Sequence, residues 1–179
     1  LNIGQIGVGT GDVTLTVNSG AIYGAASTGN HIVADNLTIS TRDGVTGNDV
    51  NRSLRTDITS LNATTESGGL YISNTDTNNG GLTVSRFEAA GGNEVTQHGA
   101  LGSLLYTSRN LTVGDVTVAS GTLYVEAGLN IADDSDDATS ISAQTVELKA
   151  GADIGTSSRD LQVDSKTLDV SAFLDIYLD

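Results

Sequence analysis

Two segments of this chain carry side chains that could hold a divalent cation. The first runs from Asn74 to Gly80 and places the oxygen ligands Asp76 and Asn78 at alternate positions before a glycine. Calcium loops use alternating Asp and Asn oxygens and a glycine that permits a sharp turn, although this segment lacks the bidentate Glu that normally follows. The alternative is a polar hairpin or a corner between strands. Weak calcium binding at Asp76 and Asn78 is the hypothesis.

The second acidic segment carries a dense cluster of carboxylates, at Asp133, Asp134, Asp136 and Asp137. A bound calcium ion would relieve the repulsion among these charges. The alternative is a solvated acidic loop. Calcium is the one cofactor that the sequence suggests.

Two tyrosines could contribute to a binding surface. Tyr71 and Tyr124 each follow a glycine turn and a leucine. Because successive residues of a strand point to opposite faces, an inward leucine leaves the tyrosine pointing outward. We therefore expect exposed rings that contact a protein partner or a surface glycan. The alternative is that both rings simply fill positions on a strand face.

Groups suited to catalysis are sparse. His31 lies in a strand-like stretch and His98 in a polar loop, and the chain has neither a cysteine nor a serine in a nucleophile-elbow motif. A pair of carboxylates that cleaves polysaccharide is the alternative, because some β-helix proteins are such enzymes. Such sites carry aromatic platforms and basic partners, whereas this chain has 8 Lys+Arg, 5 Tyr, 2 Phe and no Trp. We expect no enzyme activity.

The charge of the chain restricts its partners. The formal net charge is −14, which argues against nucleic-acid binding, because that needs a basic surface to neutralise phosphates. It also argues against electrostatic docking on anionic membranes. No apolar run approaches the roughly 18 residues of a membrane span, so we expect no membrane insertion. The absence of cysteine fits an exported bacterial protein.

The elements that would position these residues are short strands. Short segments alternate apolar and polar side chains, and turns rich in Gly, Asn, Asp and Ser separate them. No stretch has the apolar spacing of a helix. Examples of these strand-like segments are 13–17, 37–39, 61–63, 70–72, 82–84, 111–113, 123–125, 146–148 and 168–170.

The strand-like segments recur at nearly fixed intervals. The interval from Leu37 to Leu61 is close to the interval from Val146 to Leu168. Such repetition predicts a β-solenoid, in which each strand pairs with its equivalent one coil away. We expect coils of roughly 20–25 residues and about eight coils in the chain. A sandwich or a barrel is the alternative, but those folds usually bury aromatic residues that are scarce here.

Two features depart from a perfect repeat. The interval from Leu111 to Val146 is clearly longer than the others, and we expect the excess to form a loop at the 133–137 cluster. The stretch 87–102 also breaks the alternation. Thr14 and Thr16 form one Thr-x-Thr unit of the kind that ice-binding solenoids repeat. We expect that this array does not recur in register and that the chain does not bind ice.

The phrases that repeat are similar to those of a known class of proteins. Residues 56–63, followed by 67–72, resemble repeats of filamentous-haemagglutinin-like adhesins and the β-helical stretches of giant bacterial surface proteins. Residues 120–125 and 150–155 show the same likeness, which covers most of the chain. The resemblance implies a right-handed parallel β-helix, export to the cell surface, and a role in adhesion or in a surface fibre.

We therefore expect an all-β fold in which residues 1–179 form a single β-solenoid segment with uncapped ends. The segment would belong to a longer chain or to an end-to-end polymer. Unpaired strand edges at the coil ends would promote self-association. The expected function is a structural or adhesive one in a secreted bacterial surface protein or extracellular filament, without catalysis. The alternatives are a polysaccharide-binding or polysaccharide-cleaving β-helix and a calcium-dependent binding module.

Overall fold

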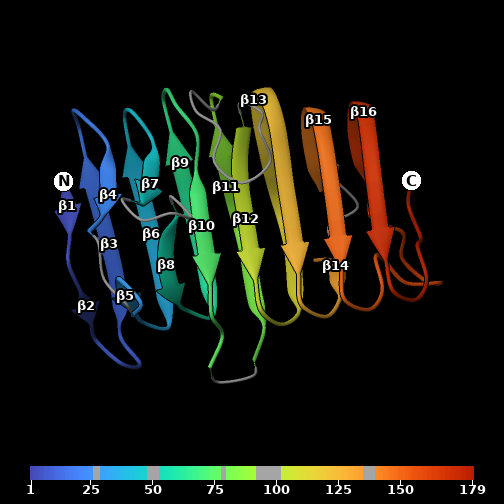
Figure 1. Ribbon diagram of the computed structural model, residues 1–179, viewed down its shortest axis with the longest axis horizontal. Coiled ribbons are helices and arrows are strands. Elements are labelled where there is room, and N and C mark those ends of the chain that lie inside the picture. The colour runs from blue at the N-terminus through green and yellow to red at the C-terminus, as the bar shows by residue number, and fades with distance from the viewer. Residues whose placement is uncertain (26–28, 48–52, 78–79, 92–101, 135–139) are drawn as a thin grey trace.

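The computed structural model describes residues 1–25, 29–47, 53–77, 80–91, 102–134 and 140–179, and within them every regular element is a β-strand. Figure 1 shows these strands side by side along the long axis of the molecule, with the two termini at opposite ends. Their bounds are β1 Asn2–Ile3, β2 Ile6–Gly7, β3 Asp12–Val17, β4 Ile22–Gly24, β5 Ile32–Val33, β6 Asn36–Thr41, β7 Val45–Gly47, β8 Leu54–Asp57, β9 Ser60–Thr65, β10 Tyr71–Asn74, β11 Leu82–Ala89, β12 Gly102–Thr107, β13 Leu111–Ala127, β14 Ile131–Asp133, β15 Ile141–Ala150 and β16 Val163–Ala172.

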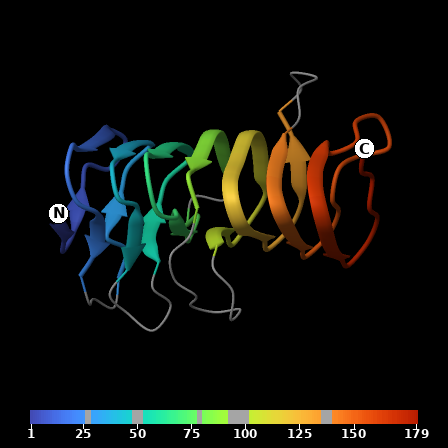
Figure 2. The same ribbon diagram turned by 90° about the horizontal axis from the view of Figure 1, so that it is seen from above.

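The strands of successive coils pair with one another and form parallel β-sheets along the axis of the molecule. One face runs β3-β6-β9-β11 and a second runs β2-β5-β8-β10-β12, while β1-β4-β7 form a smaller sheet. The long strand β13 joins the two large faces, because its first half pairs with β11 and its second half with β12. Every pairing between these strands is parallel. Viewed from above, the chain winds as successive coils (Figure 2).

This arrangement confirms the predicted parallel β-solenoid, with about six turns in place of the expected eight. The expected number was too high because one coil is longer than the spacing of Leu37 and Leu61 suggested. Those two residues are register partners, as predicted. Farther along the chain, Tyr71 pairs with Leu104 and Leu82 pairs with Leu111, so the chain between partners is longer there.

The interior is a set of aliphatic rows that run along the axis. One row passes from Ile39 through Ala63 and Phe87 to Val116, and each of these side chains is at most 1% exposed. The bulky Phe87 follows the small Ala63, so the volumes compensate between adjacent coils. Fully burying one such large side chain contributes roughly 1.5–3 kcal/mol, and the repetition along the rows sums these contributions.

One corner of the interior is polar. Asn74 is fully buried, and its Oδ1 accepts hydrogen bonds from the Thr56 hydroxyl and the Ile58 amide, both at 2.9 Å. Its Nδ2 donates to the Ile58 carbonyl at 3.0 Å. The amide therefore ties one coil to the previous one and satisfies the backbone where β8 ends. Thr107, the register neighbour of Asn74 in the next coil, is also fully buried.

Close stacking at the turns requires glycine at Gly68. Its φ is +81°, and an added Cβ would lie 2.2 Å from the Asp43 carbonyl oxygen of the preceding coil. A side chain there would be both strained and in collision with the backbone. This glycine allows adjacent coils to approach to the ordinary strand spacing.

Candidate functional site

The most distinctive outer surface lies on β10, β12 and β13. Tyr71, Leu104 and Tyr124 are register neighbours, and with Tyr106 they form an apolar cluster separate from the interior. The two tyrosines point outward, yet each is only 8% exposed. The expectation of exposed rings was therefore wrong. The cause is packing between coils, because each ring finds apolar neighbours one strand away.

Glycines beside these tyrosines leave room for the rings. A Cβ at Gly69 would lie 3.0 Å from the Tyr71 ring, and one at Gly102 would lie 3.3 Å from the Tyr124 ring. An aromatic ring that covers a glycine on a sheet shields backbone that would otherwise be exposed. Tyr71 and Tyr124 thus have a packing role in the outer face, which is the alternative considered for them from the sequence.

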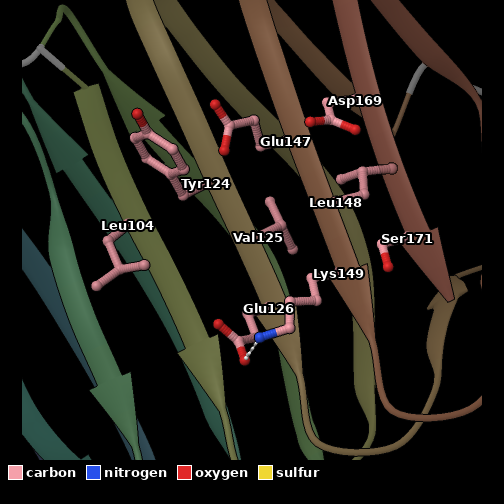
Figure 3. Close-up of a pocket in the computed structure, with 9 residues that line it drawn as sticks. All are labelled: Leu104, Tyr124, Val125, Glu126, Glu147, Leu148, Lys149, Asp169 and Ser171. Carbon is pink, nitrogen blue, oxygen red and sulfur yellow. Dashed lines mark hydrogen bonds and ion pairs between the residues drawn. The ribbon is translucent and has the colours of Figure 1, made fainter. Parts of the chain in front are cut away.

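The row of Tyr124 continues into two carboxylates, Glu147 on β15 and Asp169 on β16. Beside this row, the Lys149 ammonium donates to the Glu126 carboxylate at 2.9 Å. The two rows border a shallow cavity of about 130 Å³ (Figure 3). Its lining is Leu104, Tyr124, Val125, Glu126, Glu147, Leu148, Lys149, Asp169 and Ser171.

Two protonation equilibria at this cavity are shifted. Burial raises the pKa of the Tyr124 phenol above its usual value of 10.0, and the Glu147 carboxylate raises it further, while a hydrogen bond with Thr122 acts in the opposite direction. The hydrogen bond and the charge of Glu126 raise the pKa of Lys149 above 10.5. At neutral pH the cavity thus combines a neutral phenol, one ion pair and two further carboxylates, which can accept hydrogen bonds from hydroxyl or ammonium groups.

The first predicted calcium segment has its one described aspartate engaged in the turn. Asp76 is 4% exposed, and its Oδ2 accepts a hydrogen bond from the Gly81 amide at 2.6 Å. This bond closes the turn before β11, which is the corner role considered as the alternative. Asn78 lies outside the described residues.

The second predicted calcium segment is only partly described. Asp133 accepts a hydrogen bond from the Ser140 hydroxyl at 2.5 Å and lies 3.8 Å from the Arg159 guanidinium. A carboxylate oxygen of Asp134 lies over Gly114, where a Cβ would come within 2.6 Å of it. Asp136 and Asp137 lie outside the described residues. Within the part of the chain that the structure describes, no three His, Asp or Glu side chains come together as a metal site.

The outer face of β3, β6 and β9 has a pattern that the sequence analysis missed. Thr14 pairs with Thr38, and Thr16, Ser40 and Thr64 follow one another across three strands. The neighbouring strands thus carry Thr-x-Ser and Asn-x-Thr in register with Thr-x-Thr, so one column is formed by hydroxyl side chains throughout and the other ends in Asn62. The regular spacing of the strands could have revealed these columns. A search for Thr-x-Thr alone missed them, because serine and asparagine replace threonine at some positions.

The fold defines the chain as a parallel β-solenoid protein. Comparisons with models of protein families, with curated protein sequences and with solved structures found no match. Among the described residues, no helix is long and apolar enough to cross a membrane.

Proposed function

We propose that the chain is a structural or adhesive segment of a secreted bacterial surface protein or extracellular filament, and that it catalyses no reaction. The observation that supports this most is the continuity of the stacking, because every strand from β6 to β15 on the two large faces has a parallel partner. Such ladders make a stiff body whose length grows with the number of coils. The repeat phrases that resemble adhesins add to this support.

Immunolabelling of the producing bacterium tests the location. Antibodies raised against the 179-residue chain should label intact, unpermeabilised cells or filaments outside them. Labelling that requires permeabilisation of the cells would contradict the proposal. A cytoplasmic protein detected with the same protocol serves as the control.

End-to-end contact is the proposed means of self-association. Within the described residues β16 pairs along its length with β15, and its other edge is engaged only at Val163, whose amide donates to the Asp179 carbonyl oxygen at 2.8 Å. Leu168 and Phe173 are 42% and 82% exposed. At the other end Leu1 and Val8 are exposed. A strand edge beside exposed apolar side chains favours pairing with another copy.

Sedimentation velocity at increasing concentration tests this contact. We expect association of the wild-type chain, and its loss in Leu168→Asp. The matched control is Ser171→Asp, which adds the same charge to β16 on the outer face. A wild-type chain that stays monomeric, or equal loss of association in both variants, would contradict the end contact.

Polysaccharide binding is a second candidate, and the cavity beside Tyr124 favours it. Small-molecule pockets combine apolar and aromatic side chains with a few polar groups, and the Glu147 and Asp169 carboxylates can accept hydrogen bonds from sugar hydroxyls. A glycan array should reveal binding that Glu147→Gln weakens and the exposed control Glu66→Gln leaves unchanged. Absence of binding across the array would contradict this candidate without affecting the structural proposal.

A further inference from the structure

His31 occupies a closed corner between β4, β5 and β8. It is fully buried, and its imidazole packs directly on Gly24 of β4. A Cβ at Gly24 would lie 2.4 Å from Cε1 and 2.5 Å from Nδ1 of the ring. Any residue larger than glycine at position 24 would therefore displace the imidazole. The chain has one other histidine, His98, which lies outside the described residues.

Both nitrogens of the ring have backbone partners of opposite kind. The Arg55 amide donates to Nδ1 at 3.0 Å, and Nε2 lies 2.7 Å from the Ala25 carbonyl oxygen. An amide N–H can only donate and a carbonyl oxygen can only accept. The hydrogen-bond network therefore assigns the proton to Nε2 and the lone pair to Nδ1. Only the neutral imidazole in this tautomer satisfies both contacts.

These two bonds connect two coils. Ala25 precedes His31 in the same coil, whereas Arg55 belongs to β8, the register neighbour of β5 in the next coil. The ring thus fixes the end of β4 to β8. A backbone amide that loses its acceptor in a buried corner destabilises the folded chain, so the neutral ring is part of the stacking.

The surroundings offer little to a protonated ring. On β8 the ionisable residues are Arg55, which is cationic, and Asp57, whose carboxylate already accepts hydrogen bonds from the Thr77 amide at 3.1 Å and the Thr77 hydroxyl. On β4 the ionisable residue is Tyr23, which is 47% exposed. By sequence, β2 and β5 carry none. A proton on Nδ1 would face the Arg55 N–H and place a charge in a buried corner.

We propose that His31 is an acid-sensitive latch that holds the N-terminal coils together while its ring is neutral and releases them when the ring takes up a proton. Histidine is the side chain whose charge changes between about pH 5 and 8. Opening the corner allows the ring to bind a proton that the closed corner cannot accommodate. The stability of these coils therefore falls as the pH decreases.

Nitrogen NMR of the wild-type chain tests the assignment without any substitution. At pH 7.5 the ¹⁵N shifts of His31 should be those of the neutral ring with the proton on Nε2. Between pH 7.5 and 5.5 the protection factor of the Arg55 amide should fall by about tenfold or more, as expected for local opening. A proton on Nδ1 at pH 7.5, or a protection factor that does not change, would overturn the proposal.

Two glutamine variants separate the latch from general acid effects. Glutamine stays neutral over this range, so His31→Gln should lower the melting temperature at pH 7.5 and abolish the further decrease between pH 7.5 and 5.5. The matched control His98→Gln should retain the decrease seen in the wild type. The same decrease in all three proteins would overturn the proposal. If His31→Gln fails to fold, the NMR titration and the His98→Gln comparison decide the matter.

Discussion

The strands β15 and β16 have the same alternating pattern and are paired residue for residue, yet they are buried very differently. Val146 on β15 is fully buried, whereas its partner Leu168 on β16 is 42% exposed. Leu148 is 2% exposed, and its partner Val170 is partly exposed. The difference lies in the neighbours, because β15 has a coil on both sides and β16 has one on a single side within the described chain. Burial in this fold therefore comes from the adjacent coils as much as from the strand itself.

A buried charge should separate the two strands most strongly. Val146→Asp places a carboxylate between two coils and should destabilise the chain by about 4 kcal/mol or more. Leu168→Asp at the register partner should cost about 1 kcal/mol, because the new carboxylate can reach water. Urea unfolding of the two variants measures the difference. Equal losses would contradict the dependence on neighbouring coils.

The only two phenylalanines of the chain provide a matched pair with the next largest effect. Phe87 is fully buried and Phe173 is 82% exposed. Phe87→Ala should cost about 3–5 kcal/mol, because the cavity beside Ala63 cannot close. Phe173→Ala should change the free energy of unfolding by less than about 0.5 kcal/mol. Urea titrations at low protein concentration, where copies do not associate, measure both. A large decrease in the free energy of unfolding of Phe173→Ala would contradict the exposure of this side chain at the end of the solenoid.

Two buried threonines in the same interior row, Thr56 and Thr107, differ in their hydrogen bonding. Among the described residues, the Thr107 hydroxyl is buried without a hydrogen-bond partner, whereas the Thr56 hydroxyl in the same row donates to Asn74. Thr107→Val should therefore stabilise the chain by about 1 kcal/mol, and Thr56→Val should destabilise it by about the same amount. Thermal unfolding of both variants tests this. Destabilisation by Thr107→Val would show that its hydroxyl is satisfied.

The smallest effect concerns the ion pair between β13 and β15. The pKa of Lys149 is raised in the folded chain by Glu126, so this pair contributes stability at pH values below the ordinary lysine pKa. That contribution is lost as the pH rises through the raised pKa. Lys149→Met should be slightly less stable than the wild type at pH 8, and the difference should shrink as the pH rises above 10.5. Because the pair is exposed, a large difference at pH 8 would contradict this account.

Much of the fold could be predicted from the sequence because each coil repeats the same alternation. The spacing of Leu37 and Leu61 predicted their pairing correctly. The long interval from Leu111 to Val146 was misinterpreted, because these residues belong to different rows. Leu111 pairs with Ile131 and Val146 pairs with Leu123. Periodicity identifies inward residues but does not say on which face of a coil each one lies.

The candidate site was less predictable than the fold. Alternation placed Tyr71 and Tyr124 on the outer face, but their burial depends on Leu104 of the coil between them and on the adjacent Gly69 and Gly102. Glu147 and Asp169 join Tyr124 only through the register of β13, β15 and β16. The latch at His31 depends on two backbone groups, the Ala25 carbonyl and the Arg55 amide. Every residue type has these groups, so the sequence does not indicate that they bind the imidazole. These features need coordinates because they arise between coils.

Disulfide formation tests the parallel register most directly, because the chain has no cysteine of its own. Thr38 and Asn62 are register partners on the outer face of β6 and β9, and the Cα atoms of such partners lie about 4.8 Å apart. This separation suits a disulfide, whereas the diagonal pair Thr38 and Thr64 lies about 7–8 Å apart. The double variant Thr38→Cys, Asn62→Cys should form an intramolecular disulfide rapidly in monomeric chain, and Thr38→Cys, Thr64→Cys should not. Faster oxidation of the diagonal pair would contradict the in-register stacking on which the account depends.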